Sequence, residues 1–234
     1  MKPSEKVTIS WPDPSQVFGA FCTSLVELAL SRPKRIDGVL RVEGGLLSRQ
    51  RNEIVQLFLD RTKTDWLMMI DSDEQLSVKA FDKMVSAADA TYRPVISGLY
   101  FGTWPGGLLP QPVPHIYRRA DDGISMLPVT DYPRDRLIEV DAGGTGALLV
   151  HRRVLEAIRD KSEDHEGRDW CWFRDLPVGG LWLGEDFYFC RRIRSLGFPI
   201  WAHTGAILQH SRRYWLDERQ FEAMRAHQAE EAKP

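Results

Sequence analysis

The sequence predicts an α/β fold built on one mainly parallel sheet. Short apolar runs alternate with segments whose apolar residues recur at helical spacing, and glycine, proline or a polar cap separates one from the next. This alternation is typical of parallel strands, because a helix carries the chain back to the start of the next strand. The 234 residues, 43% hydrophobic and without an internal repeat, suit a single domain with a substantial core.

Turn and cap residues place the elements along the chain. Pro12 and Pro14 break the first strand, Ser77 is an N-cap, and Gly197 stands at a C-cap position. The strands expected in order are 7–10, 39–42, 66–70, 95–99, 137–140, 147–150, 199–202 and 206–208. The helices expected are 15–30, an amphipathic segment after the glycines at 44–45, 78–88, 153–159, 185–196 and 216–232.

Two segments interrupt the alternation. Residues 101–133 are rich in proline and contain an expected hairpin, 115–119 with 124–127, turned at Asp121-Asp122-Gly123. Residues 161–180 carry few regular signals and are expected to form a mobile loop near a site. The sequence therefore predicts a domain over 1–215 with an insertion, and a charged amphipathic tail over 216–234.

Composition narrows the function classes. The net charge of −2 and the pI near 6.3 provide no basic field, so nucleic-acid binding is not expected. Three cysteines without C-x-x-C spacing argue against a disulfide framework and a zinc knuckle, and fit a reducing cytosol. The first residues lack the apolar core of a signal peptide, and no apolar run is long enough to span a bilayer. We therefore expect a cytoplasmic protein.

Asp71 and Asp73 directly follow the apolar run 66–70. On an extended backbone this spacing points both carboxylates to one face, where their repulsion favours a divalent cation between them. An acidic turn after a strand is the alternative interpretation. His210 adds an imidazole to the two carboxylates, and this combination suits Mn²⁺ or a similar cation. A lone histidine is otherwise more often structural.

Glu185 and Asp186 begin a helix, where the dipole favours ionised carboxylates that can serve as general base, although capping alone also explains them. Arg49 and Arg51 begin another helix, against its dipole, which invites an anionic partner such as a diphosphate. A solvated basic face is the alternative interpretation there. Arg212 offers a second phosphate contact or is a surface charge.

The run Gly143-Gly144-Thr145-Gly146 has neither the ending of a phosphate-binding P-loop nor the spacing of a dinucleotide fingerprint. It favours neither a kinase nor a dehydrogenase. A close approach of backbone to a ligand and a plain tight turn are both compatible with it. Three tryptophans lie in or beside the segments with these motifs: Trp172, Trp182 and Trp215. Stacking on sugar faces and packing inside the protein are the two interpretations of them.

Taken in order, the motifs resemble a known enzyme family. The motifs are Trp11-Pro12, the segment Ser48 to Asn52, Asp71-Ser72-Asp73, Gly143 to Ala147, Gly184-Glu185-Asp186 and His210. In this order they are similar to small GT-A-fold nucleotide-sugar glycosyltransferases, of the family 2 type found in bacteria and bacteriophages. The resemblance extends from about Val7 to His210 and implies a single Rossmann-like GT-A domain.

The resemblance also implies roles for individual residues. Asp73 and His210 would bind Mn²⁺ or Mg²⁺, and Asp71 would contact the ribose or reach the metal through water. Asp186, with Glu185 beside it, would deprotonate the acceptor. The donor-binding residues implied are Trp11, Pro12, Arg49, Arg51, Asn52, Asp71, Ser72, Gly144, Thr145 and Arg212. His203 stands where relatives often carry a small polar or acidic residue, which leaves open whether it competes with His210.

The expected activity is metal-dependent transfer of a sugar from a nucleotide donor, a UDP-sugar, to the hydroxyl of a glycan, protein or small-molecule acceptor, with inversion. Two alternatives stand beside it. A sugar nucleotidyltransferase also uses acidic pairs and metal, but the chain lacks a glycine-rich loop with Lys or Arg after the first strand. A catalytically silent carbohydrate-binding module on the same fold is the other alternative. The resemblance places the protein in the cytoplasm of a bacterial cell or a phage-infected host.

Overall fold

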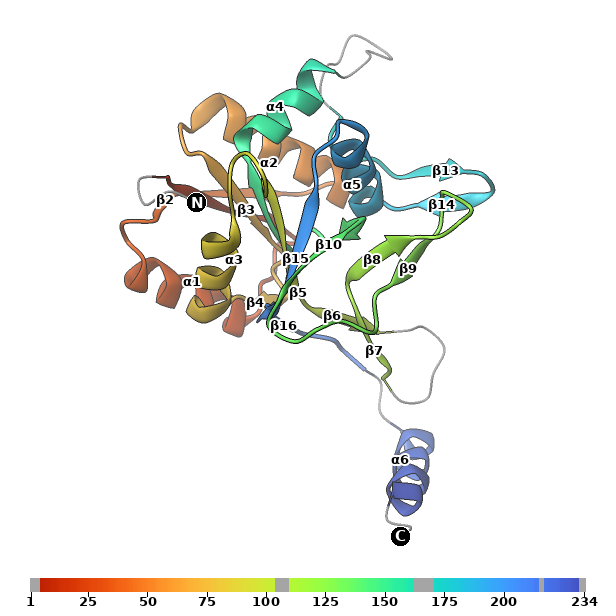
Figure 1. Ribbon diagram of the computed structural model, residues 1–234. Coiled ribbons are helices and arrows are strands. Elements are labelled where there is room, and N and C mark those ends of the chain that lie inside the picture. Colours follow the sequence, from red (N-terminus) through yellow and green to blue (C-terminus); the bar gives the residue numbers. More distant parts are fainter. Residues whose placement is uncertain (1–4, 104–109, 162–170, 215–216, 232–234) are drawn as a thin grey trace.

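A seven-stranded sheet forms the centre of the computed structural model, which describes residues 5–103, 110–161, 171–214 and 217–231 (Figure 1). Its order is β10-β15-β5-β12-β3-β1-β2. In that order the strands span Leu137–Val140, Ile200–Ile207, Val95–Leu99, Ala147–His151, Trp66–Ile70, Val7–Asp13 and Ile36–Glu43. Five strands point the same way, and only β10 and β12 run antiparallel to the strands beside them. The predicted α/β fold with a mainly parallel sheet is confirmed.

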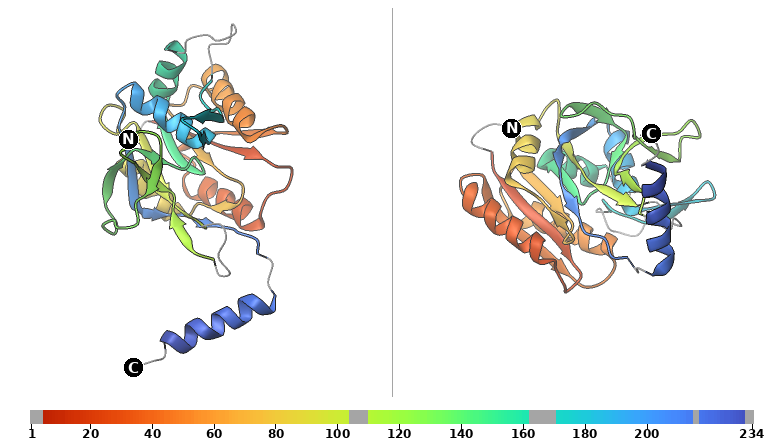
Figure 2. Two further views of the ribbon diagram at one scale, coloured as in Figure 1. Left: turned by 90° about the vertical axis from the view of Figure 1, so that its right-hand side faces the viewer. Right: turned by 90° about the horizontal axis from the view of Figure 1, so that it is seen from below.

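Helices cover both faces of this sheet (Figures 1 and 2). The helices are α1 (Gly19–Ser31), α2 (Leu47–Arg61), α3 (Val78–Ala87), α4 (Arg152–Asp160), α5 (Glu185–Ser195) and α6 (Glu218–Glu231). Buried side chains of α1 and α3 pack on one face, and those of α2, α4 and α5 pack on the other. Successive residues of β3 contribute to the two cores in turn, Leu67 to one and Met68 to the next. A strand buried on both faces has no polar side, which explains its continuous apolar run.

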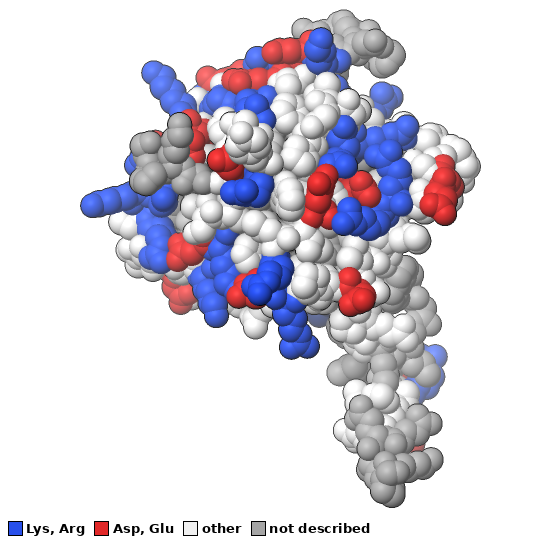
Figure 3. Space-filling view, in the orientation of Figure 1, with Lys and Arg blue, Asp and Glu red and all other residues white. Residues whose placement is uncertain are grey.

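The helix α6 lies away from the rest of the molecule (Figures 1 and 2). Its Phe221 side chain is 61% exposed. No helix within the described ranges is both long and apolar enough to cross a membrane. On the face in Figure 3, basic and acidic side chains are interspersed, in keeping with the small net charge.

Short antiparallel pairs surround one edge of the sheet. They are β6 (Phe101–Thr103) with β7 (Pro112–Pro114), β8 (Ile116–Arg119) with β9 (Met126–Pro128) and β11 (Ala142–Gly143), β13 (Leu176–Val178) with β14 (Leu181–Leu183), and β4 (Glu74–Gln75) with β16 (Gln209–His210). The predicted hairpin in the insertion is confirmed as β8 and β9, with Asp122 accepting hydrogen bonds from the turn backbone. The pair β6–β7 has no counterpart in the prediction.

Three expectations about elements are wrong in detail. The strands expected at 199–202 and 206–208 are one continuous strand, β15, because alternate residues along it are buried throughout. The helix expected from residue 15 begins only at Gly19, since Ser15 has a positive φ of 69°. The loop expected over 161–180 contains the strand β13, which pairs with β14 directly after the loop, and its Trp172 and Phe173 are core residues, each 1% exposed. Residues 162–170 of that loop lie outside the described part.

Candidate active site

The candidate site lies at the edge of the sheet where the five codirectional strands end. Asp71 follows β3, Tyr100 follows β5, and His210 comes three residues after the end of β15. Because β12 runs the other way, the glycine run that precedes it, Gly143–Gly146, reaches the same edge. The carboxyl ends of strands in an open α/β sheet are where ligands bind. The topology thus gathers motifs that are far apart in the sequence.

The Asp71-Ser72-Asp73 segment is a turn, and the expectation of an extended backbone there is wrong. β3 ends at Ile70, and the amide of Glu74 donates to the carbonyl of Asp71 at 3.1 Å. The two carboxylates therefore have different partners and do not face each other across a shared cation position. Asp71 accepts from Arg51, whereas Asp73 Oδ2 lies 3.3 Å from His210 Nε2 and 3.4 Å from Arg212.

Arg51 is the hub of the site. Its side chain is 2% exposed, and its guanidinium donates to Asp71 at 2.8 and 3.1 Å and to both Glu185 and Asp186. Burial alone would lower the pKa of Arg51, but the carboxylates of Asp186, Asp71 and Glu185 raise it overall. A diphosphate opposite this basic helix start stays a prediction, and the anions that Arg51 meets in the structure are the protein's own carboxylates.

The acidic pair occupies the first turn of α5, after the N-cap Gly184. The hydroxyl of Thr145 donates to Oδ1 of Asp186, the same oxygen that Arg51 contacts. Burial, and then the charge of Asp186, raise the pKa of Glu185 to about 7, although Arg51 acts in the opposite direction. A carboxyl with a pKa near neutrality is suited to proton transfer at physiological pH.

The side chain of Asn52, next to Arg51, fixes the backbone of Trp172 and Phe173. Its amide nitrogen donates to the carbonyls of Ser48 (2.8 Å) and Phe173 (2.7 Å). Its amide oxygen accepts from the backbone of Trp172 (2.8 Å) and Phe173 (3.0 Å). Both protons and both lone pairs are thus used within the protein. The implied donor contact by the Asn52 side chain has no place in this arrangement.

A cleft of about 430 Å³ opens between the ends of β1 and β2 and the turn after β3. Its lining residues are Pro12, Pro14, Gln16, Phe18, Gly45, Leu47, Gln50, Asp71, Ser72 and Asp73. Arg49 is exposed and lies against Gly45 at the rim. Trp11 does not line this cleft; its ring packs edge-on against Phe21 at 5.5 Å. Of the implied donor-binding residues, Pro12, Asp71 and Ser72 therefore face the cleft.

A smaller pocket of about 280 Å³ adjoins Asp73 on the other side and is also lined by Glu74 and His210. Nδ1 of His210 lies 2.9 Å from the carbonyl of Phe101. A carbonyl can only accept, so Nδ1 carries a proton, and Nε2 faces Asp73, to which it donates when it is protonated as well. A backbone carbonyl behind one ring nitrogen is the usual support of a metal-binding histidine. Burial would raise the pKa of Asp73, but the hydrogen bond from His210 and the charges of His210 and Arg212 lower it.

The glycines at 143 and 144 are required by space. Neither has a positive φ. A Cβ at Gly143 would lie 2.4 Å from Ser97 Oγ, and one at Gly144 would lie 1.8 Å from the hydroxyl oxygen of Tyr100. The backbone therefore passes directly against side chains of β5 and the residue after it. The close approach expected for this run is to the protein's own side chains.

Glu74, Tyr100 and His115 are site residues that sequence reasoning missed. Burial, followed by the charges of Asp71 and Asp73, raises the pKa of Glu74 well above its ordinary value. Burial also raises the pKa of Tyr100. His115, whose ring centroid is 4.6 Å from that of Tyr100, has its pKa lowered to about 4 by burial. Only Glu74 carried a sequence signal, since it directly follows Asp73.

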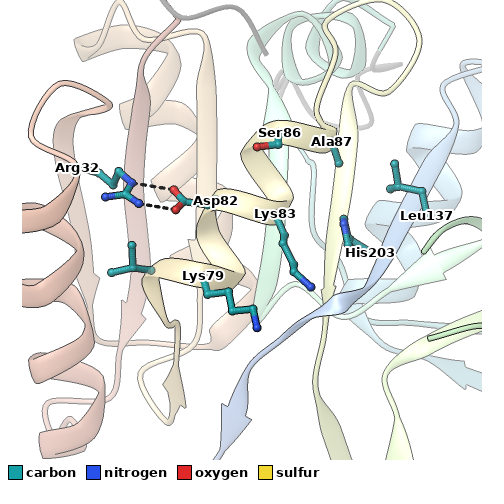
Figure 4. A pocket seen from close by; sticks show the side chains of 9 residues that line it. Arg32, Lys79, Asp82, Lys83, Ser86, Ala87, Leu137 and His203 are labelled. Carbon is teal, nitrogen blue, oxygen red and sulfur yellow. Dashed lines mark hydrogen bonds and ion pairs between the residues drawn. The ribbon is translucent and has the colours of Figure 1, made fainter. Parts of the chain in front are cut away.

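His203 lies outside the site and does not compete with His210. It lines a separate pocket of about 600 Å³ along α3, with Arg32, Lys79, Asp82 and Lys83 among the other lining residues (Figure 4).

The three tryptophans of the sequence analysis differ in their surroundings. Trp172 is buried with its Nε1 donating to Leu155, Trp182 on β14 is 72% exposed, and Trp215 lies outside the described residues.

No family model matches the chain, and no curated protein matches it. Among solved structures it is similar to A197 from STIV, with a TM-score of 0.50 and 18% identity over 91% of this chain and 87% of that chain. It is also similar to GalNAc-T7, crystallised with UDP, GalNAc and Mn²⁺, with a TM-score of 0.55 and 11% identity over 98% of this chain and 52% of that chain. This chain thus spans about half the length of the GalNAc-T7 chain. Identities this low show the fold alone, and the fold is GT-A-like.

Proposed function

We propose that this chain is a nucleotide-sugar glycosyltransferase that transfers a sugar from a UDP-sugar to an acceptor hydroxyl with inversion. The observation that carries the proposal is the cluster around Arg51, which joins Asp71 at the cleft to the acidic pair Glu185 and Asp186. Transfer requires the donor and the base that activates the acceptor to meet in one small volume. The GT-A-like fold, shared with a structure that contains UDP and Mn²⁺, supports the same assignment.

The donor would bind in the 430 Å³ cleft. Pro12 and Ser72 offer an apolar and a polar wall for the nucleoside, and Asp71 offers an acceptor for ribose hydroxyls. Arg212, 38% exposed beside Asp73, and Arg49 at the rim are guanidinium groups available to a diphosphate. Gly144 and Thr145 would act without touching the donor. Gly144 lets the backbone pass close to Tyr100, and Thr145 orients the carboxylate of Asp186.

The side chains fit a divalent cation by their chemistry. Nε2 of His210 and the carboxylates of Asp73 and Asp71 are ligands that suit Mn²⁺ or Mg²⁺, and both oxygens of Glu74 are buried without a partner in the described structure. No three such side chains in the described ranges already stand together as a metal group, so a third side chain would have to move toward His210 and Asp73. Such a cation supplies positive charge to the departing diphosphate.

Asp186 would take the proton from the acceptor hydroxyl. Arg51 and Thr145 both bind its Oδ1, which leaves Oδ2 without a hydrogen-bond partner among the described residues. A carboxylate fixed through one oxygen presents the other in a defined direction. Glu185 lies beside it on the same guanidinium and adds negative charge to the cluster.

A thermal-shift screen of nucleotide sugars with and without Mn²⁺ tests the proposal, because a ligand of the native state raises the melting temperature by mass action. We expect a UDP-sugar to raise it, and more so with Mn²⁺. Asp186→Asn should then lower turnover by about 10²-fold or more while nucleotide binding stays intact. Release of pyrophosphate from a nucleoside triphosphate would favour a nucleotidyltransferase. Glycan binding without nucleotide affinity would favour a binding module.

A further inference from the structure

Glu74 is the one carboxyl of the described site with no partner at all. Its side chain is 1% exposed, and neither of its oxygens has a hydrogen-bond partner in the described structure. A buried carboxylate in this state is strongly destabilising unless a proton or a cation compensates it. A buried, unpaired side chain at a candidate site therefore points to a missing ligand.

The oxygens of Glu74 and Asp71 converge on Gly146. The position that a Cβ of residue 146 would take is 2.3 Å from Glu74 Oε1 and 2.9 Å from Asp71 Oδ2. Gly146 has no side chain, so these two oxygens can pack directly against its backbone and close to each other. The turn holds this geometry, because the Glu74 amide donates to the Asp71 carbonyl at 3.1 Å and Glu74 pairs with His210 across β4 and β16.

The surrounding charge is negative. The carboxylates that meet here are Asp71, Asp73, Glu74, Glu185 and Asp186. Within the described residues, the guanidinium groups paired with them are Arg51 and Arg212. Five acidic groups against two basic ones favour the uptake of a divalent cation.

We propose that Glu74 is a direct ligand of the divalent cation and shares it with Asp71 beside Gly146. The turn then offers carboxylates at its first, third and fourth residues, together with the imidazole of His210. This inference rests on the cation of the proposed function, and it is independent of the donor, the acceptor and the reaction. Carboxylate oxygens are preferred ligands of Mg²⁺ and Mn²⁺, and one or two of them commonly hold the ion together with phosphates of a substrate.

Binding of Mn²⁺ to the metal-free full chain tests the proposal without any turnover. The free ion is followed by electron paramagnetic resonance, and the affinity is measured by calorimetry, with and without UDP. Glu74→Gln keeps the shape and removes the charge; we expect it to weaken Mn²⁺ binding by at least about 10-fold. Glu27→Gln makes the same change at an exposed residue of α1 and should bind as the wild type does. Equal affinity of Glu74→Gln and the wild type would overturn the proposal.

Stability of the metal-free protein shows that a loss of binding is not a loss of fold. Glu74→Gln should be at least as stable as the wild type when no metal is bound, because glutamine keeps the shape of the side chain and is neutral without taking up a proton. Mn²⁺ should raise the melting temperature of the wild type more than that of Glu74→Gln. A second variant, Gly146→Ala, puts a methyl group between the two oxygens and should weaken binding as well. Gly38→Ala is its control, since Gly38 lies on β2 outside the lining of both pockets and a Cβ there meets only the Thr8 side chain.

The outcomes separate this inference from the proposed function. Glu74-dependent Mn²⁺ binding in a chain that binds no nucleotide sugar would sustain the inference and reject the glycosyltransferase. Wild-type protein that takes up no Mn²⁺, with UDP or without it, would overturn the inference. Sugar transfer measured in the presence of a chelator would then decide the function separately.

Discussion

Arg51 and Asp71, twenty residues apart in the chain, form a two-pronged ion pair in which the guanidinium lies 2.8 and 3.1 Å from the two carboxylate oxygens. The arginine is 2% exposed and the aspartate side chain 26%. Removal of the arginine leaves Asp71, Glu185 and Asp186 close together without their shared cation. We expect Arg51→Ala to lower the free energy of unfolding by about 3–5 kcal/mol.

Urea denaturation at pH 7 measures this loss. Arg49→Ala removes an exposed arginine from the same helix and should change the free energy of unfolding by less than about 0.5 kcal/mol. An Arg51→Ala protein as stable as the Arg49→Ala protein would contradict the role of Arg51 as the hub.

Replacement of Asn52 should also destabilise the fold. Asn52→Ala leaves the Trp172 and Phe173 amides and the Phe173 carbonyl without the partners they have in the structure. Each buried unsatisfied group costs about 1–3 kcal/mol, so we expect a loss of at least about 2 kcal/mol in the free energy of unfolding. Exchange of the Trp172 and Phe173 amide protons should become faster. Asp60→Ala, at an exposed position of α2, is the control, and an equal effect of the two changes would argue against this assignment.

The raised pKa of Glu185 predicts a pH dependence of stability. Its pKa is about 7 in the folded protein, against an ordinary value of 4.5. Between these values the folded state binds the proton more tightly than the unfolded state does, so this group's contribution to stability falls as pH rises from about 4.5 to 7 and is constant above that. Glu185→Gln should remove this slope. The measurement is the difference in unfolding free energy between the two proteins at several pH values, and parallel curves would contradict the shift.

Thr145→Val should lower turnover by about 10- to 100-fold and leave nucleotide affinity unchanged. The change removes the hydroxyl that fixes Oδ1 of Asp186, and a displaced base loses rate. Thr204→Val is the matched control, because Thr204 is also buried and donates to Pro133 at 2.6 Å, but on β15 away from the acidic pair. It should lose stability and keep its turnover. Similar rates for Thr145→Val and Thr204→Val would remove Thr145 from the site.

The sequence predicted those features that depend on local pattern. The run Trp66–Ile70 is a buried strand because its residues are apolar throughout, and Glu185 begins a helix because acidic residues are favoured in a first helical turn. Local patterns could not predict which basic side chain pairs with which carboxylate. Arg51 has partners 20, 134 and 135 residues away, and the fold alone brings them together. His115, in a proline-rich insertion, carried no signal of its position beside Tyr100.

The tight contact between Gly143 and Ser97 also limits how this site can change over evolution. The obstacle to a side chain at residue 143 is the Ser97 side chain, with Oγ at 2.4 Å and Cβ at 2.7 Å, and the next atom is 4.0 Å away. The double variant Gly143→Ala with Ser97→Gly removes the Ser97 side chain that an alanine at residue 143 would meet. It should therefore recover the stability that Gly143→Ala alone loses. Gly197 has no such route, because its φ of 80° disfavours any side chain whatever its neighbours are. The two glycines are thus constrained in different ways, one by a partner that can covary and the other by its own backbone.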